Sequence, residues 1–346
     1  MPCGPGPPEQ VQIRFEKVGE SLWKGDPVRA VVYERFGPPE VLRVSEVPEP
    51  SPSPGEVKIR VRATSVNPMD VVFRSGELKG RMFSGILGPK VSILGTDMAG
   101  EVAALGEGVD DVQVGDRVVG ITPGLPGGAY AEYLCVDASA VVTIPAEVGY
   151  PEAAAFSFAG LSSWLFLQKI GGMEAGRRVL IIGASGGLGT FAVQLAHHYG
   201  AEVTGVCSTR NVELVSSLGA DEVIDYTRDD PTDARDAYDV IFDTVAVGTF
   251  GAYRRALRPA GVYSTTVMKP GVLVAMALNP LRRSGRRAHF MVGSGDPQEG
   301  LGTLRDLFIE GALRSVIELQ LPLELVVEGL HHYETGHTRG KIVLTV

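Results

Sequence analysis

The sequence predicts an α/β protein in which a doubly wound parallel sheet follows a β-rich domain. Three observations lead to this class. Strand-like and helix-like segments alternate after residue 150, a glycine-rich turn at 183–189 joins one such strand to the next helix, and strand-like segments dominate residues 28–150. The length of 346 residues suffices for about two domains.

The β-rich part begins after residues 1–27, a Pro- and Gly-rich stretch that we expect to form a loosely held N-terminal extension. Over residues 28–150, β-branched or alternating segments are separated by Gly, Pro and Asp, a pattern typical of strands. The expected strands lie at 28–33, 41–47, 56–66, 97–105, 114–120, 130–136 and 140–144. We therefore expect a compact, barrel-like domain, whose topology the pattern leaves open.

A helix is expected to open the second part, because Pro151 suits the first turn and an Ala-rich apolar segment follows. Strands and helices then alternate, which predicts βαβ units around a parallel sheet over 151–290. The expected strands lie at 177–184, 202–207, 222–225, 238–245, 262–267 and 288–292, and the expected helices at 188–199, 211–218 and 248–257.

The last segment, 291–346, has helical patterns at 301–311 and 325–335 and ends in the strand-like run KIVLTV at 341–346. We expect this strand to return to the first domain. The chain would then pass from the β-rich domain through the parallel sheet and back again.

The strongest motif is Gly-Ala-Ser-Gly-Gly-Leu-Gly at 183–189, between a strand and a helix. Aligned on its last glycine, it gives the dinucleotide-binding fingerprint with Ala184 in the place of the first glycine. Gly186 would let backbone N–H groups approach a pyrophosphate, and Gly189 would let the helix pack closely on the sheet. The candidate cofactor-binding residues are Ala184, Ser185, Gly186, Gly187, Leu188 and Gly189.

Two alternatives to nucleotide binding are open for this turn. The first is that the glycines serve packing alone. The second is the G-x-S-x-G nucleophile elbow of an α/β-hydrolase, with Ser185 as nucleophile and Asp243 and His289 following in a permitted order. The hydrolase alternative leaves Gly189 unexplained and does not fit the strand pattern before residue 177.

The end of the second strand of the parallel sheet sets the cofactor type, because a carboxylate there binds the ribose 2′-hydroxyl of NAD. The sequence has Cys-Ser-Thr-Arg-Asn at 207–211, about 20 residues after the fingerprint. Ser208 can donate a hydrogen bond to a 2′-phosphate, and Arg210 can pair with it. NADPH is therefore favoured over NADH.

A formal net charge of −9, from 32 basic and 41 acidic side chains, argues against nucleic acid as a partner. One basic run, at 282–287, is either a solvated loop or a phosphate-attracting rim of a cleft. Three widely spaced cysteines and the lack of a secretory signal pattern indicate a reducing, cytoplasmic location. The longest charge-free apolar stretch, 153–168, is too short to span a membrane.

Several motifs together resemble the zinc-independent medium-chain dehydrogenases/reductases of the quinone oxidoreductase type, over residues 28–346. Residues 211–226 and 336–344 are most similar to the branch of the reticulon-4-interacting protein and the chloroplast-envelope quinone oxidoreductase. Besides the fingerprint, the motifs are SVNPMD at 65–70, GTDMAGEV at 95–102, VGDRV at 114–118, GAYAEY at 128–133, AGLSSW at 159–164 and LGADEVIDY at 218–226.

The resemblance implies a GroES-like catalytic domain at 28–150, a Rossmann domain at 151–290 and NADPH bound between them. It implies that Asn67 faces the nicotinamide and the substrate, and that the enzyme is a homodimer. The residues that the resemblance places at the cofactor are Ser208, Arg210 and Tyr226 at the 2′-phosphate, Val245 at the border of the cofactor after the fourth strand, Phe290 and Val292 beside the nicotinamide, and Lys341 just before the last strand.

The resemblance also implies that no metal is used. Metal-dependent relatives need a Cys and a Gly-His-Glu, whereas this sequence has Asn67 and Gly-Thr-Asp at 95–97 in those places. Without a metal, hydride transfer suits quinones and α,β-unsaturated carbonyls, which delocalise the developing charge themselves and need only a hydrogen-bond donor. The alternative is a protein that binds NADPH and acts through partners with little turnover.

Overall fold

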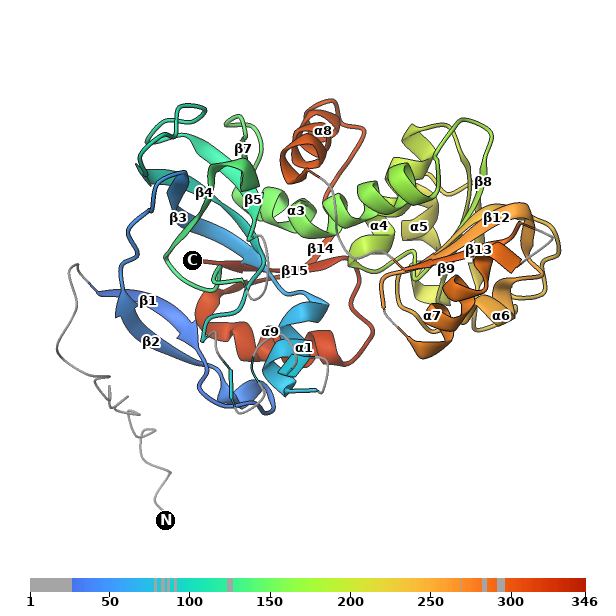
Figure 1. Ribbon diagram of the computed structural model, residues 1–346, viewed down its shortest axis with the longest axis horizontal. Helices are drawn as coiled ribbons and strands as arrows, with labels where there is room; N and C mark the ends of the chain where they lie inside the picture. Colours follow the sequence, from blue (N-terminus) through green and yellow to red (C-terminus); the bar gives the residue numbers. More distant parts are fainter. Residues whose placement is uncertain are drawn as a thin grey trace, which may run out of the picture.

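The computed structural model describes residues 27–77, 80–81, 85, 88–89, 92–122, 127–267, 269–281, 285–290 and 296–346. These residues form two lobes, and helix α3 (Tyr150–Leu165) runs from one to the other through the centre of Figure 1. The expected N-terminal extension lies outside the described residues, except for Pro27. No described helix is both long enough and apolar enough to cross a bilayer.

The first lobe is built on a seven-stranded sheet. Its strands follow the order β14-β15-β3-β4-β5-β7, and β6 pairs with β3. All neighbours are antiparallel except β14 and β15, and β1 and β2 form a separate antiparallel pair. The strands are β1 (Pro27–Val32), β2 (Arg43–Pro48), β3 (Glu56–Ser65), β4 (Asp97–Leu105), β5 (Arg117–Ile121), β6 (Tyr133–Asp137), β7 (Val141–Thr143), β14 (Ile317–Pro322) and β15 (Lys341–Thr345).

The last strand of the chain lies in the first lobe, although it follows the second lobe in sequence (Figure 1). β15 pairs antiparallel with β3, so that Val343 is opposite Ser65. β14 and α1 (Pro68–Ser75) are absent from the expectations above. The sequence does contain residues typical of the ends of a helix, which could have predicted α1: Asn67 at the N-cap, Pro at the first position and Gly76, left-handed in the structure, at the end.

The second lobe is a six-stranded parallel sheet in the order β10-β9-β8-β11-β12-β13. Because the strand order reverses at β8, the sheet is doubly wound, and the predicted fold class is confirmed. The strands are β8 (Arg178–Ile182), β9 (Glu202–Cys207), β10 (Glu222–Asp225), β11 (Tyr238–Asp243), β12 (Leu257–Thr265) and β13 (Arg287–Phe290).

Helices cover both faces of this sheet, as a parallel sheet requires. Val179 and Ile181 of β8 pack in one core cluster with α3 and α4, whereas the alternate residues Leu180 and Ile182 pack in another with α6 and α7. Besides α3, the helices of the second half of the chain are α4 (Gly187–His198), α5 (Val212–Ser217), α6 (Phe250–Tyr253), α7 (Pro270–Ala277), α8 (Pro297–Ile309) and α9 (Val326–Glu334).

Short helical turns connect several of these elements. A π-helical turn, η3 (Phe166–Ile170), continues α3. The turns of 3₁₀ type are η1 (Pro39–Val41), η2 (Ala138–Ala140), η4 (Thr209–Asn211), η5 (Asn279–Leu281) and η6 (Leu323–Leu325).

The helix expected at 248–257 is wrong over most of its length. The structure has only α6, and β12 already begins at Leu257, which pairs with Tyr238 and is buried in the sheet core. A register shift between Tyr238 and Val240, together with a left-handed Ala260 (φ 64°), lets Pro259 lie inside the strand. Pro259 and Gly261 therefore mark an irregular strand and not the end of a helix.

Candidate active site

Asn67 lies where β3 passes into α1, in the lobe that contains the last strand. It is the N-cap of α1 and only 1% exposed. The Asp70 carboxylate accepts a hydrogen bond from the backbone N–H of Asn67 at 2.8 Å, which is one half of a capping box. The backbone of Asn67 is therefore fixed, and its side chain is directed into the protein.

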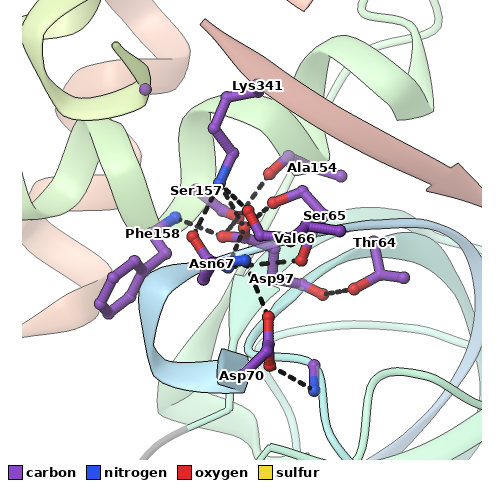
Figure 2. A network of polar contacts seen from close by, with 12 residues as sticks. Thr64, Ser65, Val66, Asn67, Asp70, Asp97, Ala154, Ser157, Phe158 and Lys341 are labelled. Atoms are coloured by element: carbon purple, nitrogen blue, oxygen red, sulfur yellow. Dashed lines mark hydrogen bonds and ion pairs between the residues drawn. The ribbon is translucent and has the colours of Figure 1, made fainter. Parts of the chain in front are cut away.

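Asp97, the first residue of β4, is fully buried at the centre of a network of polar contacts (Figure 2). Its Oδ1 accepts hydrogen bonds at 2.6 Å from the hydroxyl of Ser157 and from the backbone N–H of Phe158, both on α3. Its Oδ2 accepts hydrogen bonds from the hydroxyl of Ser65, from Asn67 Nδ2 at 2.8 Å and from Lys341 Nζ at 3.2 Å.

Lys341 brings a positive charge into the same network from β15 and is only 4% exposed. Its Nζ donates to Asn67 Oδ1 at 2.7 Å and to the carbonyl of Val66 at 3.2 Å, in addition to Asp97. Both ends of the Asn67 amide are consequently engaged, one by the ammonium and one by the carboxylate. A charge pair so buried is stable only with such a full set of hydrogen bonds.

Asp70 and Tyr130 form a second buried layer behind Asn67. Tyr130 donates its hydroxyl proton to Asp70 at 2.8 Å, and the backbone N–H of Gly95 donates to the same carboxylate at 3.1 Å. Burial raises the pKa of Asp70 to about 6, against the lowering effect of these donors. Burial and the neighbouring carboxylate also raise the pKa of Tyr130, which keeps its hydroxyl protonated as the donor in this contact.

The glycine-rich turn at 183–189 follows β8 and leads into α4, with Gly186 as the N-cap. A Cβ on Gly189 would overlap the Gly183 carbonyl and the backbone of Ala184, so this glycine is required by helix–strand packing. A Cβ on Gly186 would meet nothing closer than 3.4 Å. Packing therefore does not explain Gly186, since a side chain would find room beside its backbone.

The segment before β15 lies directly on this turn. The backbone N–H of Gly340 donates to the Ser185 carbonyl at 2.8 Å, and Gly186 and Gly340 form a β-bridge. The stem of Lys341 lies next to Gly187, where an added Cβ would be 3.0 Å from its Cδ. Lys341 thus connects the fingerprint with Asn67 and Asp97. On the other side, the carbonyl of Leu188 accepts the hydroxyl of Ser163 at 2.9 Å.

The residues expected at the 2′-phosphate lie at the carboxyl ends of β9 and β10. Ser208 follows β9, and Tyr226, which is 54% exposed, follows β10 and donates its backbone N–H to the Cys207 carbonyl. The exposed Arg210 donates from its guanidinium to the carbonyl of His337. The structure therefore brings these three residues to one edge of the sheet.

Two polar residues that the sequence analysis did not assign belong to the same edge. Asn211 Nδ2 donates to the hydroxyl of Ser185 at 2.9 Å and so connects this edge with the fingerprint. Asp225 brings a carboxylate close by, but its oxygens accept hydrogen bonds from the hydroxyls of Thr209 at 2.6 Å and Thr227 at 2.8 Å. Because β9 and β10 are neighbouring parallel strands, polar residues that follow either strand lie at one edge, and this rule could have assigned Asn211 and Asp225 to the site.

Val245 and Phe290 lie at the same carboxyl edge of the sheet, after β11 and at the end of β13. Val245 is about half exposed, and Phe290 is partly exposed. Val292, which was expected beside them, lies outside the described residues.

The hydrolase alternative has no triad in the part of the chain that the structure describes. The Ser185 hydroxyl accepts a hydrogen bond from Asn211, and among the described residues neither Ser185 nor Asp243 forms a hydrogen bond with His289. The Asp243 carboxylate instead accepts hydrogen bonds from the Tyr263 hydroxyl at 2.8 Å and from backbone N–H groups of the following loop. The described residues also contain no group of three His, Cys, Asp or Glu side chains that could hold a metal ion.

Two family models match the chain. Residues 53–146 match the alcohol dehydrogenase GroES-like domain, and residues 218–344 match the model described as zinc-binding dehydrogenase. A GroES-like β domain followed by a Rossmann-type sheet with a dinucleotide fingerprint defines a two-domain dehydrogenase or reductase.

Individual relatives narrow this class. The human mitochondrial NAD(P)H oxidoreductase RTN4IP1 is 32% identical to this chain, and the alignment covers 92% of this chain and 89% of the relative. The 2-methylene-furan-3-one reductase of Solanum lycopersicum is also 32% identical, and the alignment covers 92% of this chain and 79% of that relative. The structure of the quinone oxidoreductase from Coxiella burnetii superposes with a TM-score of 0.82 at 30% identity, covering 93% of this chain and all of that one.

The chain therefore belongs to the quinone oxidoreductase family of the medium-chain dehydrogenase/reductase superfamily, whose relatives above include NAD(P)H oxidoreductases. The predicted resemblance is confirmed. The human relative is described as mitochondrial, and the cytoplasmic location expected for this chain stays a prediction.

Proposed function

We propose that the protein transfers a hydride from NADPH to a quinone or an α,β-unsaturated carbonyl, without a metal ion. The observation that carries the proposal is the position of Lys341, whose stem lies on the fingerprint and whose ammonium contacts Asn67 and Asp97. The names of two relatives, a quinone oxidoreductase and a 2-methylene-furan-3-one reductase, support the two acceptor classes, because a 2-methylene-furan-3-one contains an α,β-unsaturated carbonyl.

The donor set around Asp97 supports the metal-free part of the proposal. Both carboxylate oxygens accept several hydrogen bonds, and the cation beside them is the Lys341 ammonium. A catalytic zinc needs three protein ligands with free lone pairs and an open fourth position. The family model described as zinc-binding covers residues 218–344, so it includes neither Asn67 nor Asp97.

The carboxyl edge of β9 and β10 supports NADPH as the cofactor. No carboxylate follows β9, and that of Asp225 is engaged by two threonines. We infer that Arg210 and the hydroxyls of Ser208 and Tyr226 hold the 2′-phosphate, since a guanidinium pairs well with a phosphate dianion. The space at Gly186 and the N-terminus of α4 would hold the diphosphate.

In this mechanism the protein mainly positions the reactants. When bound, NADPH would supply the hydride, and the chain orders residues 66–70, where β3 passes into the first turn of α1, against which the nicotinamide would lie. Asn67 is the proposed catalytic residue, with its amide held by Lys341 and Asp97. Because quinones and enones delocalise negative charge, solvent can supply the proton. Oxidation of simple alcohols is not expected, since the described residues offer no metal site that would lower the alcohol pKa.

Stopped-flow measurement of NADPH and NADH oxidation with a panel of quinones and enones tests the proposal. We expect turnover with at least one acceptor class, faster with NADPH than with NADH. Tight NADPH binding without turnover would instead favour a protein that acts through partners. Ester hydrolysis lost in Ser185→Ala would indicate a hydrolase.

Arg210→Gln tests the assignment of the 2′-phosphate site. Loss of charge-assisted hydrogen bonds worth about 1.5–3 kcal/mol should weaken NADPH binding about 10- to 100-fold and leave NADH binding unchanged. The matched control is Arg228→Gln, which removes the same charge from a side chain that pairs with Asp225 at 3.7 Å. Equal effects of the two variants on both coenzymes in a fluorescence titration would contradict the assignment.

A further inference from the structure

Four arginines surround one cavity in the second lobe, away from the site described above. The cavity has a volume of about 380 Å³ and is lined by Arg235, Asp236, Arg254, Arg255 and Arg286. A volume of this order is enough for a small ligand. The lining holds four guanidinium groups and one carboxylate, in a chain whose formal net charge is −9.

The cavity lies at the amino edge of the parallel sheet. Arg235 and Asp236 precede β11, Arg254 and Arg255 precede β12, and Arg286 directly precedes β13. These three strands are neighbours and run parallel, so their starting ends lie together. The fingerprint and Tyr226 follow strands at the opposite edge, about 20 Å away along strands of about six residues. The cavity is therefore separate from the coenzyme site.

Two members of the cavity contact each other and the neighbouring strand ends. Arg286 donates from Nε to the Leu257 carbonyl at 2.8 Å and pairs with Asp236; its side chain is only 21% exposed, whereas that of Asp236 is 63% exposed. Asp236 adopts a left-handed conformation (φ 46°), and its backbone N–H donates to the Arg255 carbonyl at 2.9 Å. These contacts connect the segments before β11, β12 and β13 at the cavity.

The other three arginines lack partners. Within the described part of the chain, the side chains of Arg235, Arg254 and Arg255 make no hydrogen bond and no ion pair, and all three are exposed. Guanidinium groups gathered around one cavity repel each other, and a bound anion would relieve that repulsion. Arginine forks match phosphate oxygens in a bidentate manner.

We propose that this cavity binds a phosphate-rich anion with at least two charges, of the inorganic diphosphate type, independently of the coenzyme. One carboxylate leaves three uncompensated positive charges in the lining, which favours a multiply charged ligand. No aromatic side chain lines the cavity, so no nucleobase would be stacked there. Of the basic run at 282–287, Arg286 lines this cavity at the amino edge of the sheet, and residues 282–284 lie outside the described residues.

Calorimetric titration of the full chain with inorganic pyrophosphate, at constant ionic strength and with NADPH present, tests the proposal. We expect one pyrophosphate per chain, with inorganic phosphate binding at least 10-fold more weakly. The double variant Arg254→Gln/Arg255→Gln should lose at least 10-fold in pyrophosphate affinity. The control Arg35→Gln removes an exposed arginine of the first lobe that has no ion pair among the described residues, and it should change affinity less than 2-fold.

Absence of saturable binding, or equal affinity in the double variant and the wild type, would overturn the proposal. Arg235→Gln provides a second test if the double variant does not fold, and it should weaken binding several-fold. A coenzyme titration with and without pyrophosphate separates the two sites, since the apparent NADPH affinity should stay the same. Direct competition with NADPH would place the anion in the coenzyme cleft and so contradict a separate site.

Discussion

At the residue scale, the candidate active site is centred on charged groups that are buried with several hydrogen-bond partners each. Asp97 and Lys341 lie 244 positions apart in sequence and have 0% and 4% of their side chains exposed. Taking both charges out of water is costly, and the hydroxyl, amide and backbone groups around them compensate for that cost. The same contacts fix the amide of Asn67.

Lys341→Met measures how strongly Asp97 depends on this ammonium. The variant leaves a buried carboxylate without its counter-charge, so we expect a loss of about 3–5 kcal/mol in the free energy of unfolding. Combining it with Asp97→Asn should recover most of that loss, since both charges are then absent. Chemical denaturation of the two single variants and the double variant gives the coupling energy. A change below about 1 kcal/mol in Lys341→Met would contradict a strongly coupled pair.

Asp70 should make stability depend on pH. Its pKa is raised from 3.8 to about 6, so the folded protein holds this proton more tightly than the unfolded chain does. The resulting stabilisation is nearly complete at about pH 3 and is lost as the pH rises through about 6. Relative to Asp70→Asn, the wild type should therefore gain about 3 kcal/mol between pH 7 and pH 3. Parallel urea titrations would contradict this if the difference stayed constant with pH.

At the scale of elements, two glycines of the turn between β8 and α4 are expected to serve different purposes, Gly189 in packing and Gly186 in coenzyme binding. Gly189→Ala would drive a methyl group into the backbone of Gly183 and Ala184, and we expect a loss of about 1–3 kcal/mol in stability. Gly186→Ala meets no such obstacle, so its stability should stay within about 1 kcal/mol of the wild type while NADPH binding weakens. Thermal unfolding and coenzyme fluorescence distinguish the two outcomes. Unchanged NADPH affinity in Gly186→Ala would contradict a diphosphate at this turn.

At the scale of the whole molecule, α3 and the last strand bind the two lobes together. One core cluster contains Ala63 and Ala99 of the first sheet, Phe156 of α3 and Ile181 of the parallel sheet. The cluster buries all of these side chains completely. We therefore expect the two lobes to unfold together and not as independent units.

The predicted homodimer also belongs to this scale. Among the described residues, β13 pairs only with β12, which leaves its outer edge open to a second strand. Leu273 and Val274 of the neighbouring α7 are exposed.

Sedimentation velocity should show twice the chain mass of 36.7 kDa. Val274→Glu should shift the protein towards the monomer, whereas Ile309→Glu, an exposed apolar position on α8, should not. A wild-type species of 36.7 kDa would contradict the dimer.

The sequence by itself determined the fold class, most of the strands and the glycine-rich turn between β8 and α4. These follow from local rules: alternation of apolar residues, helix-start residues and glycines at fixed spacing around one turn. For the segment that leads into Pro259, these local rules predicted a helix, whereas pairing with β11 makes its last part an irregular strand. The domain boundaries at 28–150, 151–290 and 291–346 stay a prediction.

Only the tertiary structure decided which distant residues meet. Ser65, Asp97, Ser157 and Lys341 come from two antiparallel strands, a helix and the last strand, and no local pattern links them. The arginine cavity likewise gathers residues from before three strands that are separate in sequence but adjacent in the sheet. Periodicity reports which face a side chain occupies, whereas strand order and register, which arise from packing over the whole chain, determine its neighbours.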